Sequence, residues 1–254
     1  MKQLLCMSAV LLSACAALAQ VKGSLTTSDG QKIDGTIKWK TAAQAYEVIK
    51  AGGNVALEMT PDKVADLNIP EPAALKGAVA QVNGATPSAA IPALEKIIAT
   101  YSHLKWDEVA TRYLAEAHLR SRNAAEARKV CEKVISGNPE AAYSGEMAPT
   151  YWSALIESGR ESKAEELMAR AIKTGDARAS AFALIRRGDL VLKGGATPEL
   201  QKKALIDGYL RVVALYRGVK DAQPEACEKA AACFEKLGQT ARAETFRQMA
   251  RSGK

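Results

Sequence analysis

The residues that could act as general bases, nucleophiles or metal ligands are few and scattered in this chain. It contains two histidines, His103 and His118, and five cysteines, at positions 6, 15, 131, 227 and 233. These residues do not follow the close Cys/His spacing that is typical of a zinc site. We therefore predict that the protein holds no metal and no other cofactor.

No motif for covalent or acid–base catalysis is present either. The chain lacks a G-x-S-x-G turn, an H-E-x-x-H helix and a Gly-Lys-Ser run that would hold a phosphate. Adjacent carboxylates such as Glu165 and Glu166 have the pattern of a solvated helix surface. We predict that the protein is not an enzyme. A cell-wall hydrolase is a distant alternative, which would require His103 or His118 beside a carboxylate in a deep pocket.

The cysteines do not form a predicted disulfide framework. Cys227 and Cys233 fall on one predicted helix, where six residues correspond to a rise of about 9 Å, too far for a bridge. Together with Cys131, they stand among alanine and phenylalanine residues. We predict that all three behave as small buried apolar side chains.

Charge is distributed unevenly along the 254 residues, whose formal net charge is +7. Residues 20–76 contain seven lysines and seven acidic residues, whereas all fourteen arginines follow residue 76. So sharp a change of composition predicts a domain boundary. The positive excess is interspersed with glutamate, which favours a mixed solvated surface over a nucleic-acid-binding stripe.

The first residues have the layout of a secretory signal peptide. Lys2 precedes an apolar run from Leu4 to Ala14, and small residues stand before a predicted cleavage between Ala19 and Gln20. About eleven apolar residues are too few to span a bilayer, and no later run is long enough. We therefore expect residues 1–19 to be removed, leaving a periplasmic or secreted protein without a transmembrane segment.

A second reading of the same segment involves Cys15. Leu12-Ser13-Ala14-Cys15 resembles the bacterial lipobox, which is cleaved before a cysteine that then carries lipid. The residues after Cys15 are apolar rather than a polar tether, which favours cleavage after Ala19. The alternative is an outer-membrane lipoprotein anchored through Cys15.

Residues 20–72 predict a small β module. Ile33, Ile37 and Trp39 alternate at period two, and Asp29-Gly30 has the chemistry of a hairpin turn. Five short predicted strands, with one helical turn at Pro61 before the last, resemble SH3-like or Sm-like small β-barrels. Trp39 and Tyr46 are expected in the core, with stacking on a ligand as the alternative. Residues 73–86 are expected to form a linker.

Residues 87–254 change to the helical period of 3.6. Asn123 and Glu126 have the spacing of a capping box, Gly137-Asn138-Pro139 ends one predicted helix, and Thr197 begins another. A pattern then recurs that resembles the tetratricopeptide repeat, a 34-residue helix–turn–helix. Its first copy comprises Leu114, Ala115, His118, Ala127, Cys131, Val134 and Pro139. A second comprises Tyr151, Trp152, Leu155, Ala164, Met168 and Ala171, and a last one Ala230, Ala231, Phe234, Ala243, Arg247 and Ala250.

The copies differ from the family pattern in places. Trp152 replaces a small residue, and Asp176 stands where proline is usual. Residues 181–216 resemble a stretched repeat with Gly188 at the small position, and residues 91–101 resemble an unpaired second helix. The packing positions Ala115 and Ala127 are expected to face each other within the first repeat.

The resemblance implies a helical solenoid that binds another polypeptide on its concave face. Carried onto this chain, the family's groove positions are Val109, Arg112, Glu116 and Leu119, with Arg120 adjacent. Arg112 and Glu116 could also form a simple helix pair. Because Glu116 replaces the asparagine of the family's carboxylate clamp, we expect an internal segment of a partner rather than a free C-terminus.

The sequence therefore predicts an α+β, multi-domain protein with a small N-terminal β-barrel-like module and an all-α tetratricopeptide-type solenoid. Its predicted role is that of an exported, non-enzymatic scaffold or adaptor in the bacterial cell envelope. The predicted partner is a protein or peptide, and nucleic acid is not expected.

Overall fold

The structure is a computed structural model that describes residues 21–252. The predicted cleavage site at Ala19 and Gln20, and the alternative lipidation site Cys15, lie outside the described residues. The chain divides into two compact units. The β unit contains residues 21–71 and Ala99–Asp107, and the helical unit contains Pro72–Ile98 and the residues from Glu108 onward.

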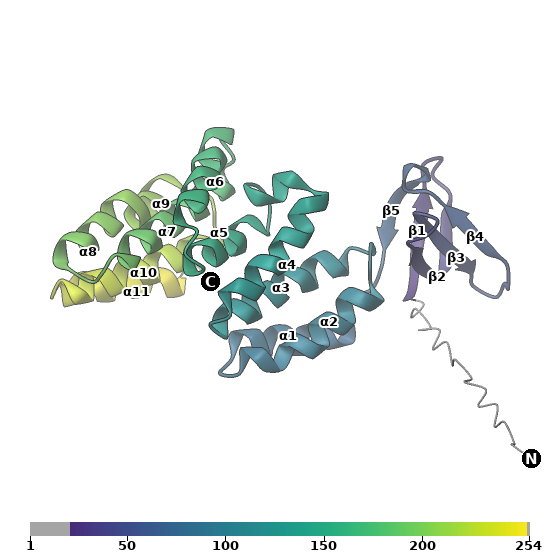
Figure 1. Ribbon diagram of the computed structural model, residues 1–254, viewed down its shortest axis with the longest axis horizontal. Coiled ribbons are helices and arrows are strands. Elements are labelled where there is room, and N and C mark those ends of the chain that lie inside the picture. The colour runs from purple at the N-terminus through teal and green to yellow at the C-terminus, as the bar shows by residue number, and fades with distance from the viewer. Residues whose placement is uncertain (1–20, 253–254) are drawn as a thin grey trace, which may run out of the picture. The chain divides into compact units, whose positions relative to one another are not determined.

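The β unit is built on one antiparallel sheet with the strand order β4-β3-β2-β1-β5 (Figure 1). The strands and the single 3-10 turn are β1 (Val21–Thr27), β2 (Lys32–Lys40), β3 (Ala45–Lys50), β4 (Ala56–Met59), η1 (Pro61–Lys63) and β5 (Val64–Asn68). Consecutive strands pair from β1 to β4, while β5 pairs with β1. β4 and β5 therefore stand at the two ends of the hydrogen-bonded order.

One face of the sheet forms the core of the β unit. Ile33, Ile37 and Trp39 of β2 are all buried, as the period-two pattern predicts. The Trp39 ring packs edge-on against Tyr46 of β3, with ring centroids 5.0 Å apart. Trp39 is thus a core residue, as expected from the sequence.

Residues 99–107 complete this core although they are far from the strands in sequence. Leu104 is fully buried among the apolar side chains of the sheet. Trp106 donates its indole N–H to the carbonyl of Ile69 at 2.8 Å, and Lys105 pairs with Asp66 at 2.8 Å. The chain therefore returns to the β unit after its first helices, which the sequence pattern did not predict.

The prediction of a linker over residues 73–86 is wrong, because residues Ala73–Asn83 form helix α1. Leu75, Ala78 and Val82 are buried along one stripe of this helix. Gly77 stands on its exposed face, where a glycine lowers helix stability by about 1 kcal/mol without ending the helix. Helix α1 is therefore the first helix of the helical unit, and α2 (Ile91–Thr100) is the second. The sequence pattern predicted instead that the helical part begins at residue 87.

The helical unit continues with a series of helices joined by short loops (Figure 1). These are η2 (Pro87–Ala90), α2 (Ile91–Thr100), α3 (Trp106–Arg120), α4 (Ala124–Gly137), η3 (Pro139–Ala142), α5 (Ala148–Glu157), α6 (Glu161–Thr174), α7 (Ala177–Lys193), α8 (Pro198–Ala204), the π-helical η4 (Leu205–Tyr209), α9 (Leu210–Leu215), α10 (Gln223–Lys236) and α11 (Thr240–Ser252).

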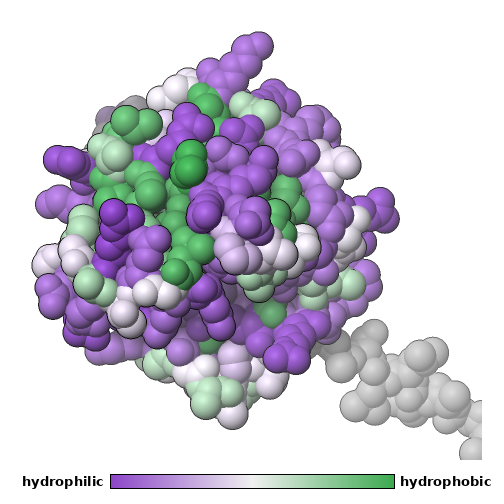
Figure 2. All heavy atoms as spheres, turned by 90° about the vertical axis from the view of Figure 1, so that its left-hand side faces the viewer, coloured by the Kyte–Doolittle hydropathy of each residue, from purple (hydrophilic) through white to green (hydrophobic). Residues whose placement is uncertain are grey.

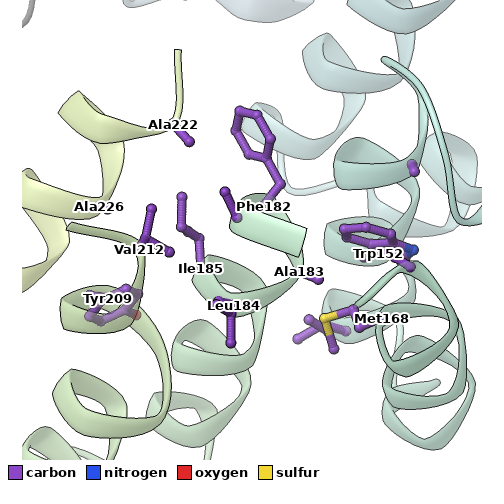
Figure 3. Packing of buried hydrophobic residues seen from close by; sticks show 14 of the residues in the cluster. Trp152, Met168, Phe182, Ala183, Leu184, Ile185, Tyr209, Val212, Ala222 and Ala226 are labelled. Atoms are coloured by element: carbon purple, nitrogen blue, oxygen red, sulfur yellow. The ribbon is translucent and has the colours of Figure 1, made fainter. Parts of the chain in front are cut away.

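Neighbouring helices pack in the manner of a helical repeat. α5 contacts α4, α6 and α7, and α10 contacts α8, α9 and α11. Trp152 of α5, Met168 of α6 and Ala183 of α7 lie together, and on the other side of α7 Ile185 points toward Val212 of α9 (Figure 3). The small residues at such crossings let helices approach closely.

The burial of Trp152 accounts for the presence of a large residue where the repeat pattern has a small one. Its side chain is fully buried, and its indole N–H donates to the carbonyl of Ala142 at 2.9 Å. The large ring is accommodated between helices and also fixes the turn η3 that precedes α5.

The helix ends follow the sequence signals only in part. Asp176 and Thr197 accept hydrogen bonds at the starts of α7 and α8, from the N–H groups of Ala179 and Leu200. Asn123 precedes α4 but its side chain makes no capping bond. The predicted capping box is therefore wrong, since Glu126 pairs instead with Lys129 at 2.6 Å.

Candidate interaction surface

The five residues predicted to line a groove all lie on α3. Val109, Arg112, Glu116 and Leu119 are partly buried, and Arg120 is exposed. Glu116 pairs with Arg120 at 3.1 Å rather than with Arg112. Arg112 lies over the Tyr113 ring at 4.4 Å and reaches Glu146, with 3.7 Å between Nε and Oε2. The alternative of a simple Arg112–Glu116 helix pair is therefore wrong.

Glu146 connects α3 with α7. Besides Arg112, it pairs with Arg178 at 3.0 Å, and Arg178 in turn pairs with Asp221 at 2.7 Å. These four residues come from α3, the turn before α5, the start of α7 and the turn before α10. These alternating charges thus link α3, α5, α7 and α10, which are the first helices of successive helix pairs. The surface that these four helices share is named the first-helix face.

A second charged cluster lies between α7 and α10. Arg186 pairs with both Asp189 and Glu225, and Lys229 pairs with Asp189 at 2.8 Å. Tyr209, in the π-helical segment, donates its hydroxyl to the same Asp189 carboxylate at 2.8 Å. Asp189 is therefore the centre of a network that joins three helical segments.

Electrostatic balance keeps this cluster charged although it is largely buried. Burial disfavours the ionised form of Asp189, but the charges of Arg186 and Lys229 outweigh this and hold its pKa below the usual value. Burial likewise acts against the charge of Arg186, yet Glu225 and Asp189 raise its pKa overall. Burial and the neighbouring Asp189 raise the pKa of Tyr209, which stays a hydrogen-bond donor.

Glu157 stands at the edge of this cluster and is not part of the predicted groove. It is the last residue of α5 and its side chain is exposed. Partial burial is the main cause that raises its pKa, and the charge of Asp189 adds to this against the opposing effect of Arg186. Sequence reasoning missed Glu157 because no residue near it in sequence marks it as special.

The residues that could have served catalysis lie on several different elements. His103 is exposed in the β unit and stacks on the Trp39 ring, with centroids 4.3 Å apart. His118 lies on α3 and is partly buried. Cys131, Cys227 and Cys233 are buried free thiols, as predicted. The two histidines thus belong to different units, His103 to the β unit and His118 to the helical unit.

The outer surface of the helical unit is mixed in character. In the view of Figure 2, hydrophilic side chains predominate, and a band of hydrophobic ones runs between them. The large exposed apolar residues include Ile206, within the π-helical segment η4, and Leu215, at the end of α9. A shallow recess at the start of α11 is lined by Gly238, Gln239, Thr240, Ala241 and Arg242.

The described part of the chain holds neither a membrane-spanning helix nor a cluster of metal ligands. Within residues 21–252, no helix is both long and apolar enough to cross a bilayer. In the same residues, no three His, Cys, Asp or Glu side chains are grouped so as to hold a metal ion.

Comparisons with known proteins add the following. No protein-family model matches the chain, and no curated protein matches it at a significant level. A solved structure titled "MamA MSR-1 C2" is 13% identical, with a TM-score of 0.37, and the match covers 70% of this chain and 93% of that one. A mutant form of MamA is 13% identical, with a TM-score of 0.36, and the match covers 70% and 94% of the two chains.

Proposed function

We propose that this protein is an exported, non-enzymatic scaffold that binds another polypeptide through the first-helix face of its helical unit. The observation that carries the proposal is the chain of ion pairs from Arg112 through Glu146 and Arg178 to Asp221. It links successive helices to one another through charged side chains that are between 25% and 63% exposed. Stacked helix pairs commonly use such an extended surface to bind polypeptides.

The repeat pattern and the N-terminal segment support the remaining parts of the proposal. The resemblance to the tetratricopeptide repeat implies a protein partner, and the apolar segment before Gln20 implies export. The strand order of the β unit, with η1 before the last strand, supports its resemblance to SH3-like modules. We assign this unit a docking or spacer role in the cell envelope.

The proposal is tested by placing a photo-crosslinking amino acid on the first-helix face. At Leu119 it should capture a partner from a cell-envelope extract, whereas at Glu165, on α6, it should not. Mass spectrometry of the captured product then identifies the partner. Equal capture from both positions would contradict the assignment of the surface.

A charge reversal tests the same face by affinity. The double variant Arg112→Glu with Arg120→Glu breaks two ion pairs of α3, and binding of the captured partner should weaken by at least about tenfold. Circular dichroism checks that the helices are intact. Unchanged affinity with an intact fold would remove α3 from the binding surface and make the β unit the docking surface.

The lipid-anchored lipoprotein is retained as the second candidate because of the Leu12–Cys15 sequence. Mass spectrometry of the mature N-terminus separates the two candidates. A chain that begins at Gln20 agrees with soluble export, whereas a diacylglyceryl group on Cys15 establishes the anchor.

A further inference from the structure

The helical run from Pro198 to Leu215, formed by α8, η4 and α9, has one packed side and one exposed side. The run packs on α7 and α10, and it buries Ala204, Leu205, Tyr209 and Val212. Its exposed side is named the α8–α9 outer face. This face consists of Lys202, Lys203, Ile206, Asp207, Arg211, Ala214 and Leu215.

Two large apolar side chains protrude from the α8–α9 outer face. Ile206 is 65% exposed and Leu215 is 67% exposed. In an uninterrupted α-helix, the spacing between these two residues would turn them to opposite sides. The π-helical segment η4 has a wider turn and therefore less rotation per residue, which is why both side chains lie on the exposed half of the run.

Each of these apolar side chains has a cation as its neighbour. Lys202 stands four residues before Ile206, and Arg211 stands four residues before Leu215, so the members of each pair lie on the same side of the helix. Both cations are exposed, as is Arg217 just after α9. The outer face therefore combines protruding apolar groups with positive charge.

Much of this positive charge is not neutralised within the protein. From Pro198 to Arg217 the chain carries four basic residues and two acidic ones, which are Lys202, Lys203, Arg211, Arg217, Glu199 and Asp207. Lys203 pairs with Asp207 at 3.6 Å. Among residues 21–252, the other three cations of this stretch form no ion pair. They are accessible to an anionic partner.

We propose that the α8–α9 outer face binds the surface of an anionic phospholipid membrane. Lys202, Arg211 and Arg217 contact lipid phosphates, while Ile206 and Leu215 enter the interfacial layer. Apolar side chains beside lysine and arginine are typical of helices that lie on such a surface. The inference goes beyond the proposed function, because this face belongs to the second helix of its pair, whereas the first-helix face lies on α7 and α10.

A lipid surface fits this face better than an acidic polypeptide does. The face is the convex outside of a helical run, and charged side chains lie between its two apolar ones. A protein partner would need a separate pocket for each protruding side chain. A membrane surface is deformable, presents phosphates throughout, and accepts isolated apolar side chains without preformed pockets.

Co-sedimentation with lipid vesicles tests the inference. The chain that begins at Gln20 contains both units and lacks the apolar N-terminal segment, which could enter a membrane by itself. It should bind vesicles of phosphatidylglycerol and phosphatidylcholine at least about tenfold more tightly than vesicles of phosphatidylcholine alone. Added salt should weaken the binding, because it screens exposed charges.

Two double variants locate the binding on the outer face. Lys202→Glu with Arg211→Glu removes the attraction to phosphates, and Ile206→Ser with Leu215→Ser removes the inserted apolar groups. Each should weaken binding to the anionic vesicles at least about tenfold. All four positions are exposed, so the fold should be retained, which circular dichroism checks.

The matched controls change the same kinds of side chain elsewhere in the helical unit. Lys96→Glu with Lys133→Glu makes the same change in net charge on α2 and α4. Met249→Ser removes an exposed apolar side chain from α11. Both controls should keep nearly the full affinity for the anionic vesicles.

The outcomes separate this inference from the proposed function. If the lysine control weakens binding as much as the outer-face variants do, net charge and not this face attracts the lipid, and the inference is overturned. Equal binding to both kinds of vesicle, or to neither, also overturns it. If a photo-crosslinker at Ile206 captures a polypeptide while no vesicle binds, the occupant is a protein. The scaffold function is tested separately, by crosslinking from Leu119.

Discussion

The ring of Tyr209 lies directly over Gly188, where a Cβ atom would come within 2.5 Å of the ring carbon Cε1. Gly208, one residue before Tyr209, approaches the same stretch of α7, with its own Cβ position 3.0 Å from the Gly188 backbone. The two glycines allow α7 and the π-helical segment to meet almost backbone to backbone. This close crossing lets the Tyr209 hydroxyl reach Asp189.

Replacing Gly188 with alanine should therefore destabilise the helical unit. The added methyl group meets the Tyr209 ring, which is 1% exposed and cannot move aside, so an overpacking cost of about 1–3 kcal/mol is expected. Urea unfolding followed by circular dichroism measures the loss. Gly77→Ala is the control, because no atom lies within 4 Å of its Cβ position and the helix α1 should become slightly more stable. Equal stability of the two variants would contradict the crossing.

Because Asp189 is charged in the folded protein, part of the free energy of unfolding should depend on pH. Its pKa is lower in the folded chain than the unfolded value of about 3.9, so its contribution is present above that pH and is lost as the pH falls through the folded pKa. Asp189→Asn should therefore cost about 1.5–3 kcal/mol at pH 7 and less near pH 3, which lies below the unfolded pKa. Urea unfolding at both pH values gives the two differences, and a difference that does not change with pH would refute the assignment.

The three buried thiols should be inert in the folded protein. Burial raises the pKa of Cys131 to about 12 and that of Cys233 to about 11, and burial also raises the pKa of Cys227. Since only the thiolate reacts, iodoacetamide at pH 8 should modify none of them until denaturant is added. Intact-mass spectrometry of the chain that begins at Gln20 counts the modified thiols. Rapid modification of Cys131 without denaturant would show that the packing around α4 is wrong.

Leu104 should stabilise the β unit even though it lies far from the strands in sequence. Its side chain is fully buried in the core of the sheet, and Leu104→Ala is expected to cost about 2–5 kcal/mol. In a Trp152→Phe background, the remaining tryptophans Trp39 and Trp106 both belong to this unit, and their fluorescence during urea unfolding reports on it. The neighbouring variant Lys105→Ala, at an exposed position, should change stability by about 1 kcal/mol or less. A similar small effect of both variants would mean that residues 99–107 are not part of the β unit.

Ala127 provides a test of the first helix pair, α3 and α4. It is fully buried, as the repeat pattern requires of a packing position. Ala127→Leu adds volume without space to hold it, and a cost of about 1–3 kcal/mol is expected. A thermal melt that matches that of the unmodified protein would contradict the proposed repeat register.

Local patterns in the sequence determined the types of element and much of their order. The alternation of Ile33, Ile37 and Trp39 predicted a half-buried strand, and the spacing of Ala127 and Cys131 predicted the buried stripe of α4. Such patterns are reliable because periods of 2 and 3.6 follow directly from backbone geometry. They failed at residues 73–83, where Gly77 suggested a linker, because an exposed glycine lowers helix propensity without affecting the buried stripe that stabilises α1.

Only the tertiary structure decided which residues meet. Arg112 stands four residues from Glu116, yet it pairs with Glu146, because Arg120 takes Glu116 and the packing of α3 brings the turn before α5 within reach. Leu104 packs into the core of the sheet because the chain returns to the β unit after α2. Glu157 is affected by three cations but forms no ion pair with them, because each of these cations binds another carboxylate. Periodicity in a sequence reports which face of a helix or strand is buried, whereas the partner on that face depends on contacts between segments that are distant along the chain.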